Sequence, residues 1–166
     1  MKTLLLLLSS LALQFSQGEP KLAEVRCLYF KSADEKASAG KLCALLEPVD
    51  SSYTPVMVCY KGAAEMMRAR YSLNPIHKFS SFKNGRALIE SAIKRDSTAI
   101  ESRFIRFSIQ SNLPAFLNYD QNIKKDKSML IHGIPTVADT LLKKLMLNFL
   151  AGNKYVTKEE LNQIRQ

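Results

Sequence analysis

The 166-residue chain has no tryptophan, six glycines and only two histidines. The lack of tryptophan weakens the case for carbohydrate binding. His77 and His132 have no metal-ligand neighbour at the spacing of a zinc site. The chain also lacks the glycine patterns of phosphate and dinucleotide sites, the G-x-S-x-G turn and the H-E-x-x-H pair. We therefore expect no catalytic site, no cofactor and no metal, and the alternative is an enzyme with a site assembled from dispersed Cys, His and carboxylate residues.

The chain has no apolar run long enough to cross a membrane, because a spanning helix needs about 20 apolar residues. Its leucine-rich run at 4–13 follows Lys2 and precedes small residues that end at Gly18, which is the order of a secretory signal peptide. We predict that residues 1–18 are a signal peptide and that the protein is exported, to a periplasm or as a secreted protein. Residues 19–166 are then one domain without a linker, and a retained N-terminal anchor is the alternative.

Acidic residues are few, and the formal net charge is +9. The excess lies in residues 61–110, which hold ten Lys and Arg against four Asp and Glu. Such a field favours anionic partners, such as acidic lipids, surface polysaccharides or acidic protein faces. The alternative is that these side chains only solvate outer helix faces. Export and the lack of a recognition motif argue against nucleic acid.

Alternating strands with hairpin turns are absent, and apolar residues recur at helical spacing throughout. Turn and cap signals separate the predicted helices: a turn at 47–52, Asn74-Pro75, a capping box at Thr98–Glu101, Asn112-Leu113-Pro114, a break at 132–135 with Thr136 as the next cap, and Thr157–Glu160. Asn84-Gly85 marks a bend or a close helix contact. Because the loops are short, we predict an all-α fold of antiparallel helical hairpins in an array or bundle.

Three cysteines cannot all pair within one chain, and the exported setting permits disulfides. Cys43 and Cys59 lie eight residues on either side of Ser51, at the predicted turn of a hairpin. If the two helices are antiparallel, these residues face each other at a similar height, which predicts a Cys43–Cys59 bridge. A Cys27–Cys43 bridge and three buried thiols are the alternatives.

Two arginines lie within an apolar helix pattern. Arg103 and Arg106 are three residues apart beside Phe104, on one face of a predicted helix. One interpretation is that they pin two helices together by pairing with carboxylates such as Glu90. The other is a surface groove that receives an acidic segment, since arginine suits bidentate contacts with carboxylate or phosphate. The groove would be formed by Lys83, Arg86, Arg103 and Arg106.

The segment Ala87–Asp96 resembles the second helix of a tetratricopeptide repeat, with Ser97 where the family has proline. This resemblance implies repeat-like, tetratricopeptide-like helical hairpins.

A second resemblance covers the run from Tyr60 to Ile131. The residues that carry it are Tyr60-Lys61-Gly62-Ala63, Asn74-Pro75, Phe82, Gly85, Glu90, Ala92-Ile93, Glu101-Ser102-Arg103-Phe104-Ile105-Arg106, Pro114, Tyr119, Asn122-Ile123 and Asp126-Lys127. This run is similar to a group of exported α-helical proteins of Bacteroidota that have no assigned function. The resemblance implies export and a helical fold. From the hairpin architecture, the basic central segment and the lack of a catalytic set, we predict a non-enzymatic interaction or scaffold protein of the cell envelope, with an unknown protein or an anionic envelope component as its partner.

Overall fold

The computed structural model describes residues 20–165, which form α-helices and two short 3₁₀ turns without a strand. The all-α prediction is confirmed, whereas the predicted signal peptide lies outside the described residues. In chain order the elements are α1 (Leu22–Ser32), α2 (Lys36–Leu45), α3 (Pro55–Tyr71), α4 (Pro75–Arg95), α5 (Ile100–Asn112), η1 (Ala115–Leu117), α6 (Ile123–Gly133), η2 (Ile134–Thr136), α7 (Thr140–Ala151) and α8 (Lys158–Arg165). None of these helices combines the length and the hydropathy that a membrane crossing requires.

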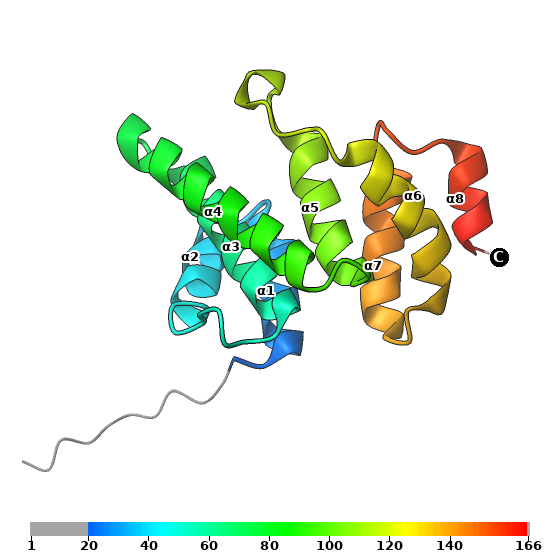
Figure 1. Ribbon diagram of the computed structural model, residues 1–166, viewed down its shortest axis with the longest axis horizontal. Helices are drawn as coiled ribbons and strands as arrows, with labels where there is room; N and C mark the ends of the chain where they lie inside the picture. Colours follow the sequence, from blue (N-terminus) through cyan, green and yellow to red (C-terminus); the bar gives the residue numbers. More distant parts are fainter. Residues whose placement is uncertain (1–19, 166) are drawn as a thin grey trace, which may run out of the picture.

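The core consists of two apolar clusters that meet at α5. Every residue of α5 from Ser102 to Ser111 is buried. Ile105 and Ile109 belong to a cluster formed with α1 to α4, whereas Phe104 and Phe107 belong to a cluster formed with α6 to α8. In Figure 1, α5 accordingly lies between the first four helices and the last three. Most polar side chains of such a helix are hydrogen-bonded inside the protein, whereas Ser102 Oγ and both amide atoms of Gln110 have no partner among the described residues.

Helices α3 and α4 form a tight hairpin because two glycines face each other. A Cβ atom at Gly62 would lie 2.8 Å from the carbonyl oxygen of Gly85, and one at Gly85 would lie 2.7 Å from that of Gly62. Only glycine permits this close approach of two helix backbones. Of the two predictions for Asn84-Gly85, a bend or a close helix contact, the structure has the contact, and α4 continues through it. The turn between α3 and α4 points away from the other described helices (Figure 1).

The local boundary signals had mixed success. Asn74 caps α4, since its Oδ1 accepts hydrogen bonds from the backbone N–H groups of Ile76 and His77. Thr157 and Glu160 form the reciprocal bonds of a capping box at α8. Two expectations were wrong. The turn before α5 is an Asx turn on Asp96 and not a capping box on Thr98. Helix α7 begins at Thr140 with Asp139 as its cap, and not after Thr136, because residues 134–136 form η2.

Successive helices pack on each other, α1 on α2, α3 on α4 and α5 on α6, as expected for helical hairpins. The tetratricopeptide-like detail is not confirmed. Tandem repeats reuse one unit of fixed length, whereas these helices range from 8 to 21 residues. The segment Ala87–Arg95 is the second half of α4 and not a separate helix.

Candidate functional site

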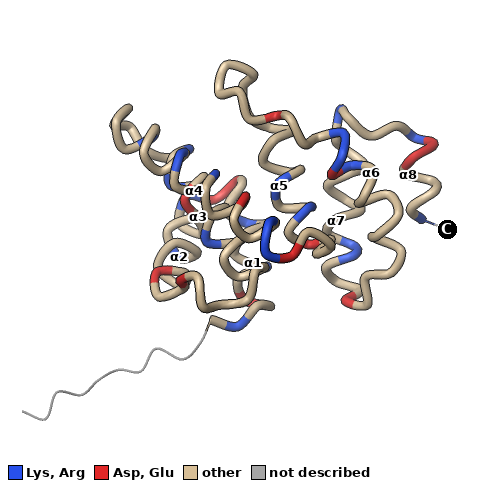
Figure 2. Tube along the Cα trace, in the orientation of Figure 1, with Lys and Arg blue, Asp and Glu red and all other residues tan. Residues whose placement is uncertain are grey.

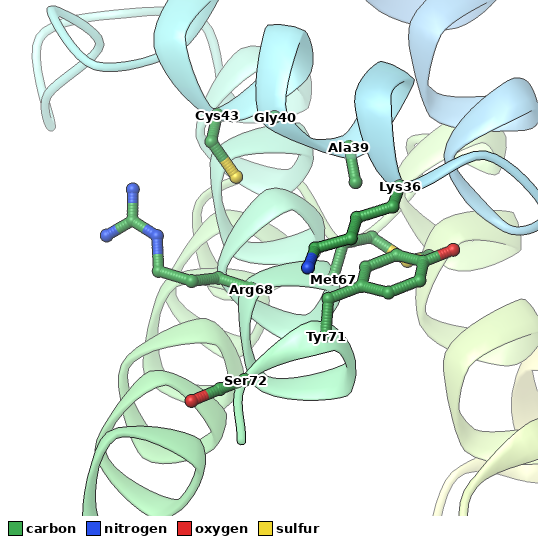
Figure 3. Close-up of a pocket in the computed structure, with 8 residues that line it drawn as sticks. All are labelled: Lys36, Ala39, Gly40, Cys43, Met67, Arg68, Tyr71 and Ser72. Atoms are coloured by element: carbon green, nitrogen blue, oxygen red, sulfur yellow. The ribbon is translucent and has the colours of Figure 1, made fainter. Parts of the chain in front are cut away.

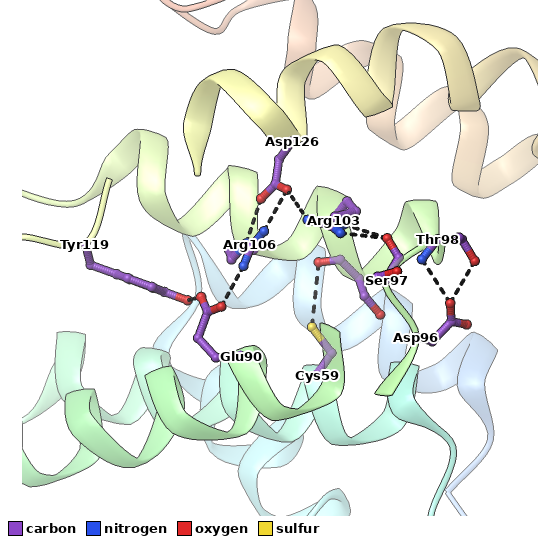
Figure 4. Close-up of polar contacts among 10 residues, drawn as sticks. Cys59, Glu90, Asp96, Ser97, Thr98, Arg103, Arg106, Tyr119 and Asp126 are labelled. Carbon is purple, nitrogen blue, oxygen red and sulfur yellow. Dashed lines mark hydrogen bonds and ion pairs between the residues drawn. The ribbon is translucent and has the colours of Figure 1, made fainter. Parts of the chain in front are cut away.

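The two arginines of α5 are buried and share one carboxylate. The Nη1 of Arg103 donates to Oδ1 of Asp126 at 2.9 Å. Arg106 donates to the same carboxylate twice, from Nε to Oδ2 at 2.7 Å and from Nη2 to Oδ1 at 2.8 Å. Asp126, from α6, is fully buried, and both arginines are only 3% exposed. This three-residue cluster, the arginine–aspartate brace, joins α5 to α6 (Figure 4).

The brace continues outward to α4 and to the loop before α6. Arg106 Nη1 donates to Oε2 of Glu90 at 2.6 Å, and the hydroxyl of Tyr119 donates to Oε1 of Glu90 at 2.7 Å. Arg103 donates twice to the carbonyl oxygen of Ser97. The four charged residues neutralise one another, so the arginines do not project charge into solvent.

Burial and pairing shift the pKa values within this network. Burial lowers the pKa of Arg106, but the hydrogen bonds and the charge of Asp126 more than offset this effect, so the pKa is raised. Burial, followed by the hydrogen bond with Glu90, raises the pKa of Tyr119 well above its ordinary range. Both shifts move the pKa further from neutral pH, so both groups stay protonated there, as a structural brace requires.

A second ion-pair cluster joins the two halves of the described chain. Arg26 of α1 donates from Nε and Nη2 to the two carboxylate oxygens of Glu101, each at 2.6 Å, and from Nη1 to Asp139 at 2.7 Å. The hydroxyl of Tyr60 also donates to Glu101, at 2.7 Å. Sequence analysis missed Arg26 because its partners lie 75 and 113 residues away.

The predicted four-residue basic groove is wrong. Arg103 and Arg106 are inside the fold, and Glu90 pairs with Arg106 rather than with Arg103. Lys83 and Arg86 are exposed on α4. Of the two interpretations of the arginine pair, the structure has the helix brace. Acidic and basic residues lie close together here, as Figure 2 shows along the first turn of α6, where a red segment lies next to blue ones.

The predicted Cys43–Cys59 bridge is also absent, and Cys27, Cys43 and Cys59 are free thiols. The Sγ of Cys43 donates to the carbonyl oxygen of Ala64, five residues beyond Cys59 along α3. The hairpin therefore turns later than Ser51. Cys59 is fully buried and donates to the carbonyl oxygen of Ser102. Only this cysteine fits the alternative of a fully buried thiol, since Cys27 is exposed and Cys43 is half-buried.

The environment of the cysteines and histidines does not form a reactive pair. Burial raises the pKa of Cys59 strongly and that of Cys43 to a lesser degree, so both thiols are protonated at neutral pH and are weak nucleophiles. His77 is exposed in the first turn of α4, and His132 is exposed at the end of α6 with Nδ1 bonded to the carbonyl oxygen of Ser128. Across residues 20–165, no cluster of three or more His, Cys, Asp or Glu side chains could hold a metal ion.

Two open grooves lie beside α2. The groove between α2 and α3 has a volume of about 340 Å³ and is drawn in Figure 3. Lys36, Arg68 and Tyr71 are among its lining residues. The hydroxyl of Tyr71 is already used, because it donates to the carbonyl oxygens of Ser32 and Ala33. The groove between α1 and α2, about 580 Å³, is lined by Glu24, Cys27, Leu28, Lys41, Ala44, Leu45 and Pro48. The cysteine of the first groove, Cys43, is hydrogen-bonded to a backbone carbonyl oxygen and not to a general base.

The surface feature that stands apart is the free end of the α3–α4 hairpin. Leu73, Ile76 and Phe79 are 98%, 77% and 60% exposed, although all three are large apolar side chains. Residues 75–80 of α4 are exposed on every side. We refer to residues 70–83 as the hairpin end. The helical spacing of Ile76, Phe79 and Phe82 does not reveal this exposure, because spacing alone cannot tell that the first turns of α4 extend beyond their neighbours.

Comparison of the chain with protein-family models, with curated proteins and with solved structures finds no match. The resemblance to exported Bacteroidota proteins therefore stays a prediction, as does the secretory address of residues 1–18. The function must be argued from the geometry described above.

Proposed function

We propose that this protein is a non-enzymatic, exported interaction protein that binds an anionic partner through the hairpin end. In this proposal the eight described helices are a scaffold, and the protein acts at the cell envelope or outside the cell. The proposed export rests on the signal-like order of residues 1–18.

The interior chemistry supports a scaffold role. Arg103, Arg106 and Asp126 are tied to one another inside the fold, and Arg26 and Glu101 form a second cluster. These ion pairs connect helices, and the carboxylates of the two clusters are held by guanidinium and phenol groups, so they do not suit general acid–base work. We infer that these buried charge clusters serve to fix one arrangement of the helices.

The choice of the hairpin end as the binding surface rests on the charge of the stretch around it. The stretch from residue 66 to residue 89 contains no Asp or Glu. It contains five cations, which are Arg68, Arg70, Lys78, Lys83 and Arg86. All five are exposed, and the three most exposed apolar side chains of the hairpin lie among them. A local field of one sign next to an unpartnered apolar patch favours an anionic partner with some apolar character.

Chromatography on heparin, used as an anionic polymer, tests this surface. The double variant Lys78→Gln/Lys83→Gln removes two charges from the hairpin end. The matched control, Lys124→Gln/Lys125→Gln, removes the same charge from exposed positions on α6. We expect the hairpin variant to elute at a clearly lower salt concentration than the control, because binding strength and its salt dependence follow the charges in contact.

Equal elution of the two variants would show that net charge, and not the hairpin end, sets the affinity for anions. That result would refute the proposed function. Thermal unfolding followed by circular dichroism must give the same midpoint for both variants, since exposed substitutions leave stability nearly unchanged.

A further inference from the structure

The apolar residues of the hairpin end lie on a projection and not in a groove. Leu73 is in the turn, and Ile76 and Phe79 follow within the first five residues of α4. Other large apolar side chains are exposed singly, such as Phe116 in η1 and Leu141 in α7. Single exposed apolar side chains are ordinary, whereas a cluster of them marks an interaction site.

The cations lie beside this apolar cluster. Lys78 is between Ile76 and Phe79 in sequence, and the ammonium of Lys83 lies 5.7 Å from the ring centre of Phe79. Arg70 precedes Leu73 by three residues and lies over the ring of Tyr71. The nearest carboxylates in sequence are Glu65, which pairs with Arg68, and Glu90, which belongs to the network of the brace. The hairpin end is therefore positive without internal neutralisation.

Three kinds of occupant could cover such a surface, and charge and shape decide between them. A second copy of the chain would bring the same three cations, Arg70, Lys78 and Lys83, against their counterparts, which is unfavourable. An acidic protein could satisfy the cations, but a convex apolar projection needs a matching cavity in that protein. A lipid surface needs no cavity, since it accepts apolar side chains at the boundary between headgroups and acyl chains, and anionic headgroups attract the flanking cations.

We propose that the hairpin end binds an anionic lipid surface, with Leu73, Ile76 and Phe79 inserted below the headgroups and Arg70, Lys78 and Lys83 at headgroup level. This inference rests on the proposed function and names its partner. The protein attaches from one side, by an exposed turn supported by the Gly62–Gly85 contact.

The absence of tryptophan offers a direct test. Phe79→Trp places the only indole of the chain at the hairpin end, and Phe116→Trp places it at another exposed site, in η1. We expect the emission of the first variant to shift to the blue with vesicles of phosphatidylcholine and phosphatidylglycerol, but not with phosphatidylcholine alone. The Phe116→Trp control should not shift. Residues 1–19 are the same in both variants, so any binding through them affects both alike. A shift seen only for Phe79→Trp therefore reports the position of residue 79.

Titration of the Phe79→Trp chain with the anionic vesicles then measures how much each side chain contributes to the affinity for the vesicles. Each apolar change, Leu73→Ser or Ile76→Ser, should weaken binding by roughly tenfold. Each of Lys78→Gln and Lys83→Gln should weaken it by roughly fivefold, whereas the control pair at Lys124 and Lys125 should not.

Three results would overturn the lipid assignment: no shift on anionic vesicles, an equal shift on neutral vesicles, or an equal shift of the Phe116→Trp control. If any of these occurred while heparin elution still depended on Lys78 and Lys83, the proposed function would stand with a non-lipid anionic partner. Failure in both experiments would refute both proposals.

Discussion

Neutralising Asp126 should be among the most damaging single changes in the chain. The substitution Asp126→Asn keeps the shape of the side chain but removes the negative charge between Arg103 and Arg106. The carboxylate accepts three hydrogen bonds from them, at 2.7 to 2.9 Å. An asparagine can accept on one atom only, and its amide N–H groups would face the guanidinium nitrogens.

The expected loss of stability depends on which partners the two arginines keep in the Asp126→Asn variant. Arg106 keeps Glu90, which is partly exposed, and Arg103 keeps the carbonyl oxygen of Ser97. Removing one partner of a buried ion pair costs about 3–5 kcal/mol, against a total stability of about 5–15 kcal/mol for a domain. At this chain length 1 kcal/mol shifts the unfolding midpoint by roughly 2–4 °C, so we expect a fall of roughly 6–20 °C.

Thermal and urea unfolding, followed by circular dichroism at the helical band, measure this loss. Asp120→Asn is the matched control, because Asp120 is exposed and this change should stay within about 0.5 kcal/mol of the wild type. Asp126→Glu keeps the charge and adds one methylene, with an expected loss of about 1–3 kcal/mol from overpacking. If Asp126→Asn proved as stable as Asp120→Asn, the brace would not hold α5 and α6 together and the reasoning would fail.

Further changes test other parts of the fold. Gly62→Ala should destabilise by about 1–3 kcal/mol in urea unfolding, since its Cβ would meet the backbone of Gly85, whereas Gly40→Ala, with open space around it, should stabilise α2 by about 0.5–1 kcal/mol. Equal effects would contradict the close hairpin contact. In thiol labelling, exposed Cys27 should react rapidly and buried Cys59 only on unfolding; simultaneous reaction would contradict the burial of Cys59. Stability should also fall with pH above about 10, because burial raises the pKa of three tyrosines and only the unfolded chain then ionises them, at about 1.4 kcal/mol per pH unit each. These are Tyr29, Tyr60 and Tyr119. Phenolate absorbance from these rings that appeared before the loss of helical signal would refute this assignment.

The sequence predicted what short-range chemistry decides. The Asn74-Pro75 pair marked the start of α4 correctly, because a side-chain oxygen and a fixed proline φ act within one turn. The start of α7 was wrong because Thr136 and Asp139 are both plausible caps. Asp139 also pairs with Arg26 of α1, a contact that local spacing does not contain.

The candidate site was harder to predict for the same reason. Arg103 and Arg106 have a pattern typical of both a surface groove and a buried brace, and their common partner lies 20 or more residues away on α6. One signal was present: Phe104, Ile105 and Phe107 surround the arginines on all sides of the helix, which is the pattern of a buried helix. A cation placed in such a helix requires an internal carboxylate.

Folding divides the cations of one basic segment between the brace, inside the protein, and the surface of the α3–α4 hairpin. Residues 61–110 appeared in the sequence as one basic segment, yet Arg103 and Arg106 are neutralised inside the fold by Asp126 and Glu90. The cations of residues 66–89 remain in solvent, and only Arg68 among them has a carboxylate partner in the described chain, Glu65. Folding therefore removes two cations of the basic segment from the surface and leaves five exposed between residues 66 and 89, with Lys94 and Arg95 exposed at the far end of α4. Because close glycine packing and a braced α5 hold that hairpin, its charge and its apolar side chains are presented together on a rigid support, which reduces the entropy lost when they bind.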